Sequence, residues 1–112
     1  MAEDLYPPII RDLPLANIPF EGVKGHLLQG ASRQVIFFDI ETIGVIPEHA
    51  HGAQWGVILE GEVELTISGV ARTCRKGDSY YIPAGAPHSV SVKTRCKALD
   101  LFEEVDRYQP KE

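Results

Sequence analysis

The stretch IPEHAHGAQWGVILEGE, residues 46–62, places two histidines one residue apart, directly before a run typical of a β-strand. Successive side chains of a strand point to opposite faces, so His49 and His51 would share a face and their rings could converge on one point. Imidazole nitrogens are common ligands of transition metals. The spacing therefore indicates a candidate metal site.

A second stretch, KGDSYYIPAGAPHSV at residues 76–90, repeats this indication. Gly77 and Asp78 predict a turn, SYYI predicts a strand, and the Pro-Gly-rich corner after it delivers His88 to the start of the next strand. The remaining histidine, His26, lies outside both stretches, and we interpret it as a non-ligand.

The rest of the chain favours strands over helices. Short runs rich in β-branched and aromatic residues, separated by Gly and Pro, are typical of a sandwich or barrel. The expected strands cover residues 33–43, 54–67 with a break at Gly61, 79–83, 88–92 and 97–102. We therefore predict an all-β fold.

Apolar alternation predicts which strand faces are buried. In VELTI, Val63, Leu65 and Ile67 alternate with polar residues, which indicates one buried and one solvated face. In WGVIL both parities are apolar, so Gly56 and Ile58 would face the core while Trp55, Val57 and Leu59 face a second layer. Another subunit could supply that layer, and we expect a homodimer.

Length and charge restrict the class of protein. The 112 residues predict one domain, 1–112, with a proline-rich extended arm at residues 1–20. The net charge of -5 without a basic run argues against a nucleic-acid partner. No apolar stretch suits a membrane span or a leader, so we expect a cytoplasmic protein. Cys74 and Cys96 lack zinc-site spacing and are interpreted as free thiols.

Both histidine stretches resemble the two motifs of the cupin superfamily, small RmlC-like β-barrels of the jelly-roll (double-stranded β-helix) type with a metal site inside. The second motif is matched at every spacing by Gly77, Pro83, Gly85 and His88, although Val92 stands where an Asn is frequent. The first is matched less closely: four residues instead of five separate Gly44 from His49, and Gln54 replaces the usual Glu.

The resemblance implies that one divalent ion (Zn, Ni, Mn or Fe) is held by His49, His51, Gln54 and His88. The alternative for Gln54 is an ordinary polar residue at a strand start. Three imidazoles and an amide would leave the charge of the ion uncompensated, which makes it a strong Lewis acid and favours lyase, isomerase or hydrolytic chemistry over oxygenation.

Enzymatic proton transfer also needs a proton carrier near the ion. In KALDLF, Asp100 shares a strand face with Ala98 and Phe102, so it faces either a polar cavity or the solvent. A narrower resemblance links the chain to small cupins that open unsaturated ketouronates. It implies Asp100 and Phe102 as site residues, and Arg107, which is offset by about one residue from the corresponding Arg.

Two classes of function follow. The first is a metal-dependent lyase or isomerase that acts on a small sugar acid or keto acid, in which Asp100 moves a proton, Arg107 assists, and Phe102 and Tyr81 shape the pocket. The second is a non-catalytic cupin that binds a small molecule or a metal. A metal-dependent oxygenase, which would require iron, is a further alternative.

Overall fold

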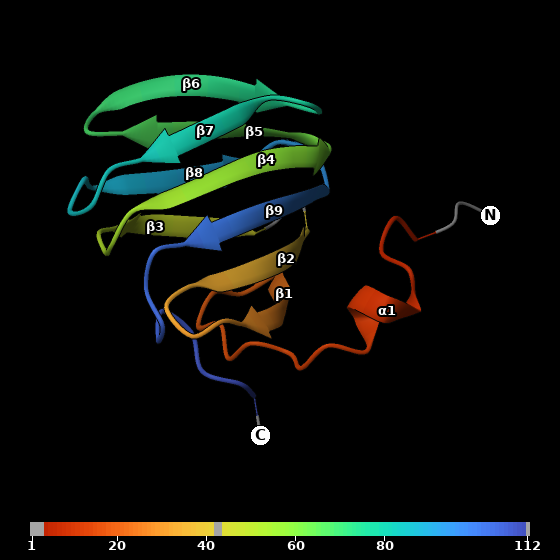
Figure 1. Cartoon of the computed structure of the whole chain (residues 1–112). Coiled ribbons are helices and arrows are strands. Elements are labelled where there is room, and N and C mark those ends of the chain that lie inside the picture. The colour runs from red at the N-terminus through yellow and green to blue at the C-terminus, as the bar shows by residue number, and fades with distance from the viewer. Residues whose placement is uncertain (1–3, 42–43, 112) are drawn as a thin grey trace.

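The computed structural model describes residues 4–41 and 44–111, which form nine strands and one short helix. The start of the predicted arm (residues 1–3) and the end of the predicted 33–43 strand (residues 42–43) lie outside the described residues. Figure 1 shows the strands as two sheets that face each other. The predicted all-β fold of jelly-roll type is confirmed.

Each sheet is antiparallel throughout. The five-stranded sheet has the order β1 (Val23–Gln29), β2 (Gln34–Ile40), β9 (Cys96–Phe102), β4 (Gln54–Glu60) and β7 (Ser79–Ile82). The four-stranded sheet has the order β3 (Val45–His49), β8 (His88–Val92), β5 (Glu62–Ile67) and β6 (Val70–Arg75). Strands distant in sequence are therefore neighbours, and β9 lies between β2 and β4.

The core fills the space between the two sheets. Ile58 of β4 and Val63 and Leu65 of β5 are buried, as their alternation predicts, whereas Trp55 on the outer face of β4 is 43% exposed. The chain turns between β5 and β6 at Ser68-Gly69, where both residues have positive φ, as a two-residue hairpin turn requires.

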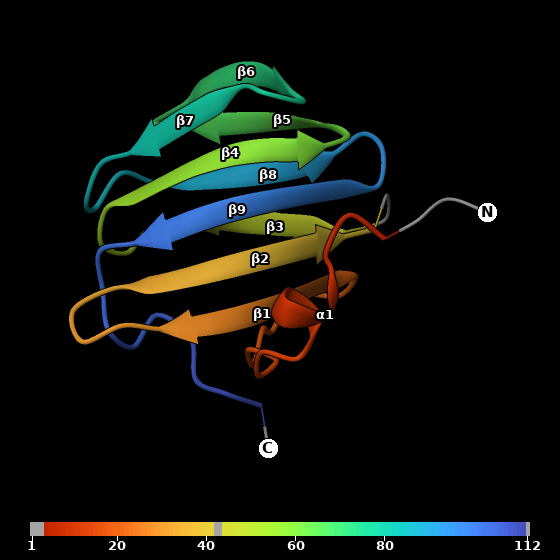
Figure 2. The same ribbon diagram turned by 45° about the vertical axis from the view of Figure 1, so that its right-hand side comes forward.

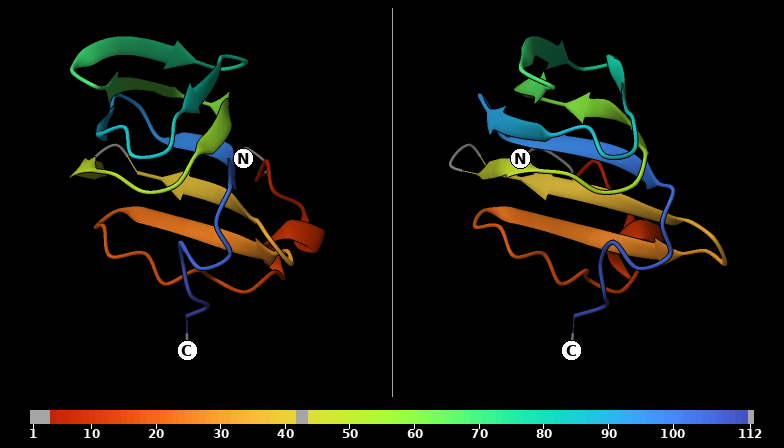
Figure 3. Two further views of the ribbon diagram at one scale, coloured as in Figure 1. Left: turned by 60° about the vertical axis from the view of Figure 1, so that its left-hand side comes forward. Right: turned by 90° about the vertical axis from the view of Figure 1, so that its left-hand side faces the viewer.

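The N-terminal arm departs from a fully extended course. Residues Pro8–Arg11 form the single helical turn α1, because proline is well tolerated in the first turn of a helix. Farther along, Leu15 bridges to β1, and Ala16 bridges to Pro110. Figures 2 and 3 show the arm and the segment after β9 on the β1 side of the barrel. Together they shield an edge strand from further pairing.

Asp4 and Tyr6 of the arm contact the five-stranded sheet. Tyr6 donates a hydrogen bond to the carbonyl oxygen of Phe38 at 2.6 Å, and its ring packs edge-on against Phe37. Lys97 forms ion pairs with Asp39 at 3.3 Å and Asp4 at 3.7 Å. These contacts cover part of the outer face of the sheet.

Two further expectations concern cysteines and membrane spans. Cys74 and Cys96 are both buried free thiols, as predicted. Within residues 4–41 and 44–111, no helix has the length and apolar character that crossing a membrane would need.

Candidate metal centre

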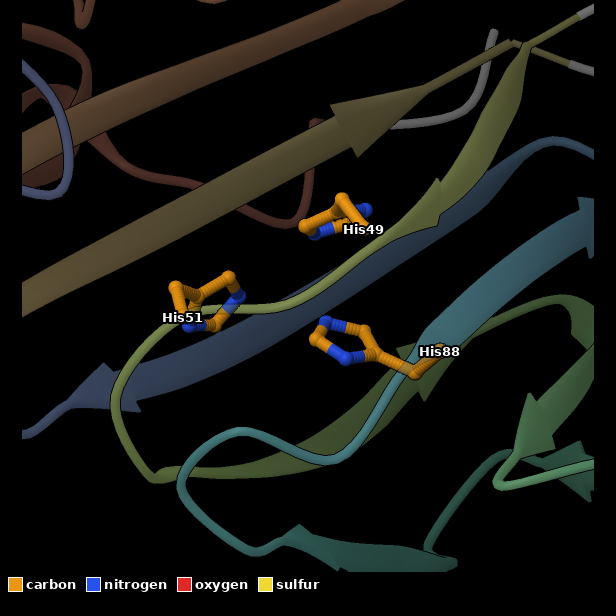
Figure 4. A group of neighbouring side chains, drawn as sticks. All are labelled: His49, His51 and His88. Carbon is orange, nitrogen blue, oxygen red and sulfur yellow. The ribbon is translucent and has the colours of Figure 1, made fainter.

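Three histidines meet at one end of the barrel (Figure 4). His49 ends β3 and pairs in register with His88, which begins β8, while His51 follows in the segment that leads to β4. The ring centroids are 4.3 Å apart for His49 and His88, 4.8 Å for His51 and His88, and 5.2 Å for His49 and His51. One candidate ligand atom from each ring lies within 4.8 Å of the others.

Backbone carbonyls fix how these rings present their nitrogens. The Nδ1 atoms of His49, His51 and His88 lie 2.8, 2.8 and 2.9 Å from the carbonyl oxygens of Pro47, Gly52 and Ala86, respectively. A carbonyl oxygen only accepts, so each Nδ1 carries the proton and donates it. Each Nε2 therefore keeps its lone pair, which is the form that binds a metal.

Burial also favours the neutral form of two of these rings, those of His49 and His51. Burial lowers the pKa of His49. It also lowers the pKa of His51 to about 4, although the hydrogen bond to the Gly52 carbonyl raises it. The positive charge of Arg107 lowers both pKa values further. Neutral imidazole is the ligating species, so near neutral pH neither ring needs to lose a proton before an ion binds.

Gln54, the first residue of β4, lines the same cavity as the histidines. Its Nε2 donates to Oδ2 of Asp100 at 2.6 Å. Among the described residues, Gln54 Oε1 and His51 Nε2 are buried without a hydrogen-bond partner. Leaving buried polar atoms unpaired is costly, and a cation would satisfy both. The donor set therefore fits a divalent metal ion, with Gln54 available as an oxygen ligand.

Asp100 lies on the inner face of β9 and is 1% exposed, so of the two alternatives, cavity or solvent, it faces the cavity. The hydroxyl of Tyr80 donates to its carboxyl oxygens at 2.8 and 2.9 Å. Burial raises the pKa of Asp100 to about 7, although the hydrogen bonds from Gln54 and Tyr80 favour the charged form. The carboxyl group thus titrates close to neutral pH.

The cavity measures about 50 Å³, and most of its wall is apolar. Phe102 lines it, as expected. The placement of Tyr81 in the pocket is wrong: Tyr81 is 58% exposed on the outer face, and Tyr80 lines the cavity instead. Adjacent strand residues point to opposite faces, and Tyr80 shares the parity of the buried Ile82.

Arg107 lies in the segment after β9, outside the residues that line the cavity. Its guanidinium carbon sits 4.4 Å from the ring centre of Tyr108, a cavity residue. Its Nε is buried and, within the described part of the chain, has no hydrogen-bond partner. Arg107 thus packs on a residue of the cavity wall without itself lining the cavity, and it is near enough to influence the histidines.

Three residues of this region were not predicted from the sequence. Tyr80 and Tyr108 line the cavity, and Glu104 Oε1 accepts a hydrogen bond from the Gly52 amide at 2.7 Å and lies 3.4 Å from His51 Nδ1. The parity of Tyr80 with Ile82 was a usable signal. Glu104 follows the last strand with no pattern that marks it.

The fourth histidine, which we expected not to be a ligand, lies away from the cluster. His26 lies on β1, with Nδ1 3.2 Å from the carbonyl oxygen of Leu13, outside the group of three histidines.

Comparisons with known proteins agree with this architecture. An RmlC-like cupin from Shewanella frigidimarina is 19% identical, with a TM-score of 0.78 over 94% of this chain and 95% of that one. KdgF from a Halomonas species is 20% identical, with a TM-score of 0.70 over 82% and 86% of the two chains. Bacillus subtilis oxalate decarboxylase, described with Mn(II) centres, is 19% identical, with a TM-score of 0.72 over 82% of this chain and 28% of that one.

At these identities the structural likeness shows the fold alone. A search of curated proteins finds no matching sequence. The sequence family described as "Cupin domain" matches residues 36–102, which is more than half of the chain and includes His49, His51, His88 and Asp100. The chain therefore belongs to the cupin family.

Proposed function

We propose that this cupin is a metal-dependent lyase or isomerase that acts on a small keto acid or sugar acid. His49, His51, His88 and Gln54 would hold one divalent ion, which would act as a Lewis acid toward oxygen atoms of the substrate. Support for the ligands comes from the three free Nε2 lone pairs and the unpartnered Oε1 atom of Gln54.

The observation that favours catalysis over binding alone is the position of Asp100. Its carboxyl group is buried on the cavity wall and hydrogen-bonded to the candidate ligand Gln54. Burying a carboxyl group is unfavourable, so its place on the cavity wall calls for a function, and a catalytic site requires a proton carrier at such a place. In this proposal Asp100 accepts a proton from the substrate and returns it at another atom.

The cavity wall favours a keto acid over a sugar acid. Residues such as Ile58, Leu65, Ile82 and Phe102 offer no hydrogen bonds. Each sugar hydroxyl buried against them without a partner would cost about 1–3 kcal/mol. A keto acid with a short aliphatic remainder avoids that cost. The sugar-acid alternative is supported by the narrower resemblance to ketouronate-opening cupins.

Arg107 supplies positive charge beside the histidine cluster. Its buried Nε–H has no partner within residues 4–41 and 44–111, so it is available to an acceptor. Arg107 does not line the cavity, so its charge would act on a substrate carboxylate at a distance, by Coulomb attraction. We therefore keep Arg107 in the proposal as a group that orients the substrate.

The test has two stages. The metal content of protein purified without added ions identifies the ion. Short aliphatic keto acids and unsaturated ketouronates are then offered to the protein, and their loss is followed by NMR. Asp100→Asn should lower turnover by roughly 100-fold or more, the usual worth of a positioned acid or base. Asp12→Asn, on the exposed arm, is the matched control.

The outcomes separate the classes of function. No turnover of any compound would favour the non-catalytic cupin. Turnover that consumes O2 and requires iron would favour the oxygenase. An active parent matched by its Asp100→Asn variant would remove Asp100 as the proton carrier.

A further inference from the structure

We propose that Tyr80, Gly56 and Asp100 form a clamp that holds the side-chain amide of Gln54 with its oxygen free for the metal ion. The inference rests on the proposed assignment of Gln54 as a ligand and goes beyond it, because it gives three other residues a positioning function. An amide group binds a hard cation through its oxygen, so its orientation decides whether Gln54 can act as a ligand.

The clamp is built across three adjacent strands. Gly56 of β4 pairs in register with Tyr80 of β7 on one side and with Asp100 of β9 on the other. Figure 1 shows β4 between β7 and β9. Neighbouring strands lie about 4.8 Å apart, so Tyr80 and Asp100 start from backbones roughly 10 Å apart. The long phenol side chain spans this gap and brings its hydroxyl to 2.8 Å from the carboxyl group.

Gly56 makes the crossing possible. A Cβ atom at this position would lie 2.5 Å from both Cζ and the hydroxyl oxygen of Tyr80, and it would also clash with Oδ2 of Asp100. Real Cβ atoms essentially never approach that closely. The absence of a side chain at residue 56 is therefore what allows Tyr80 to reach over β4.

The hydrogen bonds then determine the orientation of the amide. Oδ2 of Asp100 accepts from the Tyr80 hydroxyl at 2.8 Å and from Nε2 of Gln54 at 2.6 Å. Turning the amide over would place Oε1 against an oxygen of the ionised carboxylate, which has no hydrogen to donate, and would leave the NH2 group without this acceptor. The arrangement thus keeps Nε2 on Asp100 and Oε1 unpartnered within the cavity wall.

The experiment measures Co2+ binding to metal-stripped protein. Tyr80→Phe removes the hydroxyl that holds Asp100 and should raise the dissociation constant of Co2+ by about 10-fold to 100-fold, the usual effect of losing a partner that orients a ligand. The visible spectrum of bound Co2+ should shift toward that of Gln54→Ala. Tyr81→Phe makes the same chemical change on the outer face and should leave both readouts unchanged.

A double-mutant cycle separates positioning from general loosening of the fold. If Tyr80 acts through Gln54, then adding Tyr80→Phe to Gln54→Ala should change the Co2+ affinity no further. In the metal-free protein, the NMR signals of the Gln54 side-chain amide should move in Tyr80→Phe and stay in place in Tyr81→Phe. Gly56→Ala should reproduce the effect of Tyr80→Phe where it folds.

Asp100→Asn distinguishes this proposal from the proposed enzymatic function. Turnover of this variant is measured at a metal concentration that saturates its site, so a loss of turnover reports on the proton carrier whatever the Co2+ affinity of the variant. Parent-like Co2+ binding by Tyr80→Phe, or full additivity in the cycle, would overturn the clamp. Parent-like binding by Gln54→Ala would also overturn it, because Gln54 would then not be a ligand, and the turnover test of Asp100 would still stand.

Discussion

Replacing Asp100 with Asn should stabilise the metal-free protein, and the gain should grow as the pH rises. Burial raises the pKa of Asp100 from 3.8 to about 7, so the folded protein holds this proton more tightly than the unfolded chain. Between these two values the native state binds more protons than the unfolded state, and the free energy of unfolding falls as pH increases. Asn has nearly the same shape and no proton to lose.

The size of the effect follows from the shift. The pKa of Asp100 rises by about three on folding, and each step of one corresponds to about 1.4 kcal/mol. At pH values above the folded pKa, the free energy of unfolding is therefore lower by on the order of 4 kcal/mol. At about pH 4 the native carboxyl group is protonated, and most of this cost is absent. The stability difference between Asp100→Asn and the parent should therefore rise from small values near pH 4 to several kcal/mol near pH 8.

Urea unfolding of EDTA-treated parent and variant at a series of pH values measures this difference. His49 and His51 titrate in both proteins, and their lowered pKa values destabilise the fold as pH falls below their ordinary value of 6.5, so subtraction removes their contribution. A stability difference that stays constant from about pH 4 to about pH 8 would refute the reasoning. A variant less stable than the parent near pH 8 would refute it as well.

Three further predictions follow from the site and the surface. His51→Ala should abolish tight binding of the ion. At a metal concentration 100 times the parent's Kd, the ion should stabilise the parent by about 2.7 kcal/mol and leave the variant unstabilised, which thermal unfolding with and without metal measures. Gln54→Glu should retain the ion but slow turnover. Its new carboxyl group would meet that of Asp100, where a hydrogen bond of 2.6 Å now lies, so the two groups should share one proton. This coupling should add a step to the pH–rate profile. We propose a homodimer across the outer sheet face that carries Trp55, and a monomer mass by light scattering at micromolar concentration would contradict it.

Local sequence patterns were sufficient for the strands with strong alternation or β-branched content. The break at Gly61 and the bounds of β8 agree with the structure. The strands β1, β3 and β6 were not predicted as such, for different reasons. Gly25 interrupts β1, Pro47 lies within β3, and the residues of β6 are mostly exposed and half of them are Arg or Thr, so none of these strands shows a clear apolar alternation.

The sequence was sufficient to predict those site residues that stand at a recognisable spacing along the chain. The three histidines were found from motif spacing, and the structure brings them together. The hydrogen bond between Gln54 and Asp100 joins residues 46 positions apart, and it depends on β4 pairing with β9, which no local pattern encodes. The choice of Tyr81 over Tyr80 was a one-residue error of strand parity, which moves a side chain to the opposite face.

The carbonyl oxygens that orient the histidines belong to residues one or two positions away in the chain. Pro47, Gly52 and Ala86 are part of the same short segments as the rings they hold. The cavity wall, in contrast, is assembled from distant strands such as β2, β5 and β9. Wall substitutions can therefore accumulate without altering how the imidazoles are presented. A lineage, or an engineer, could exchange one substrate for another by changing the apolar residues of the wall while the three imidazoles remain presented as before.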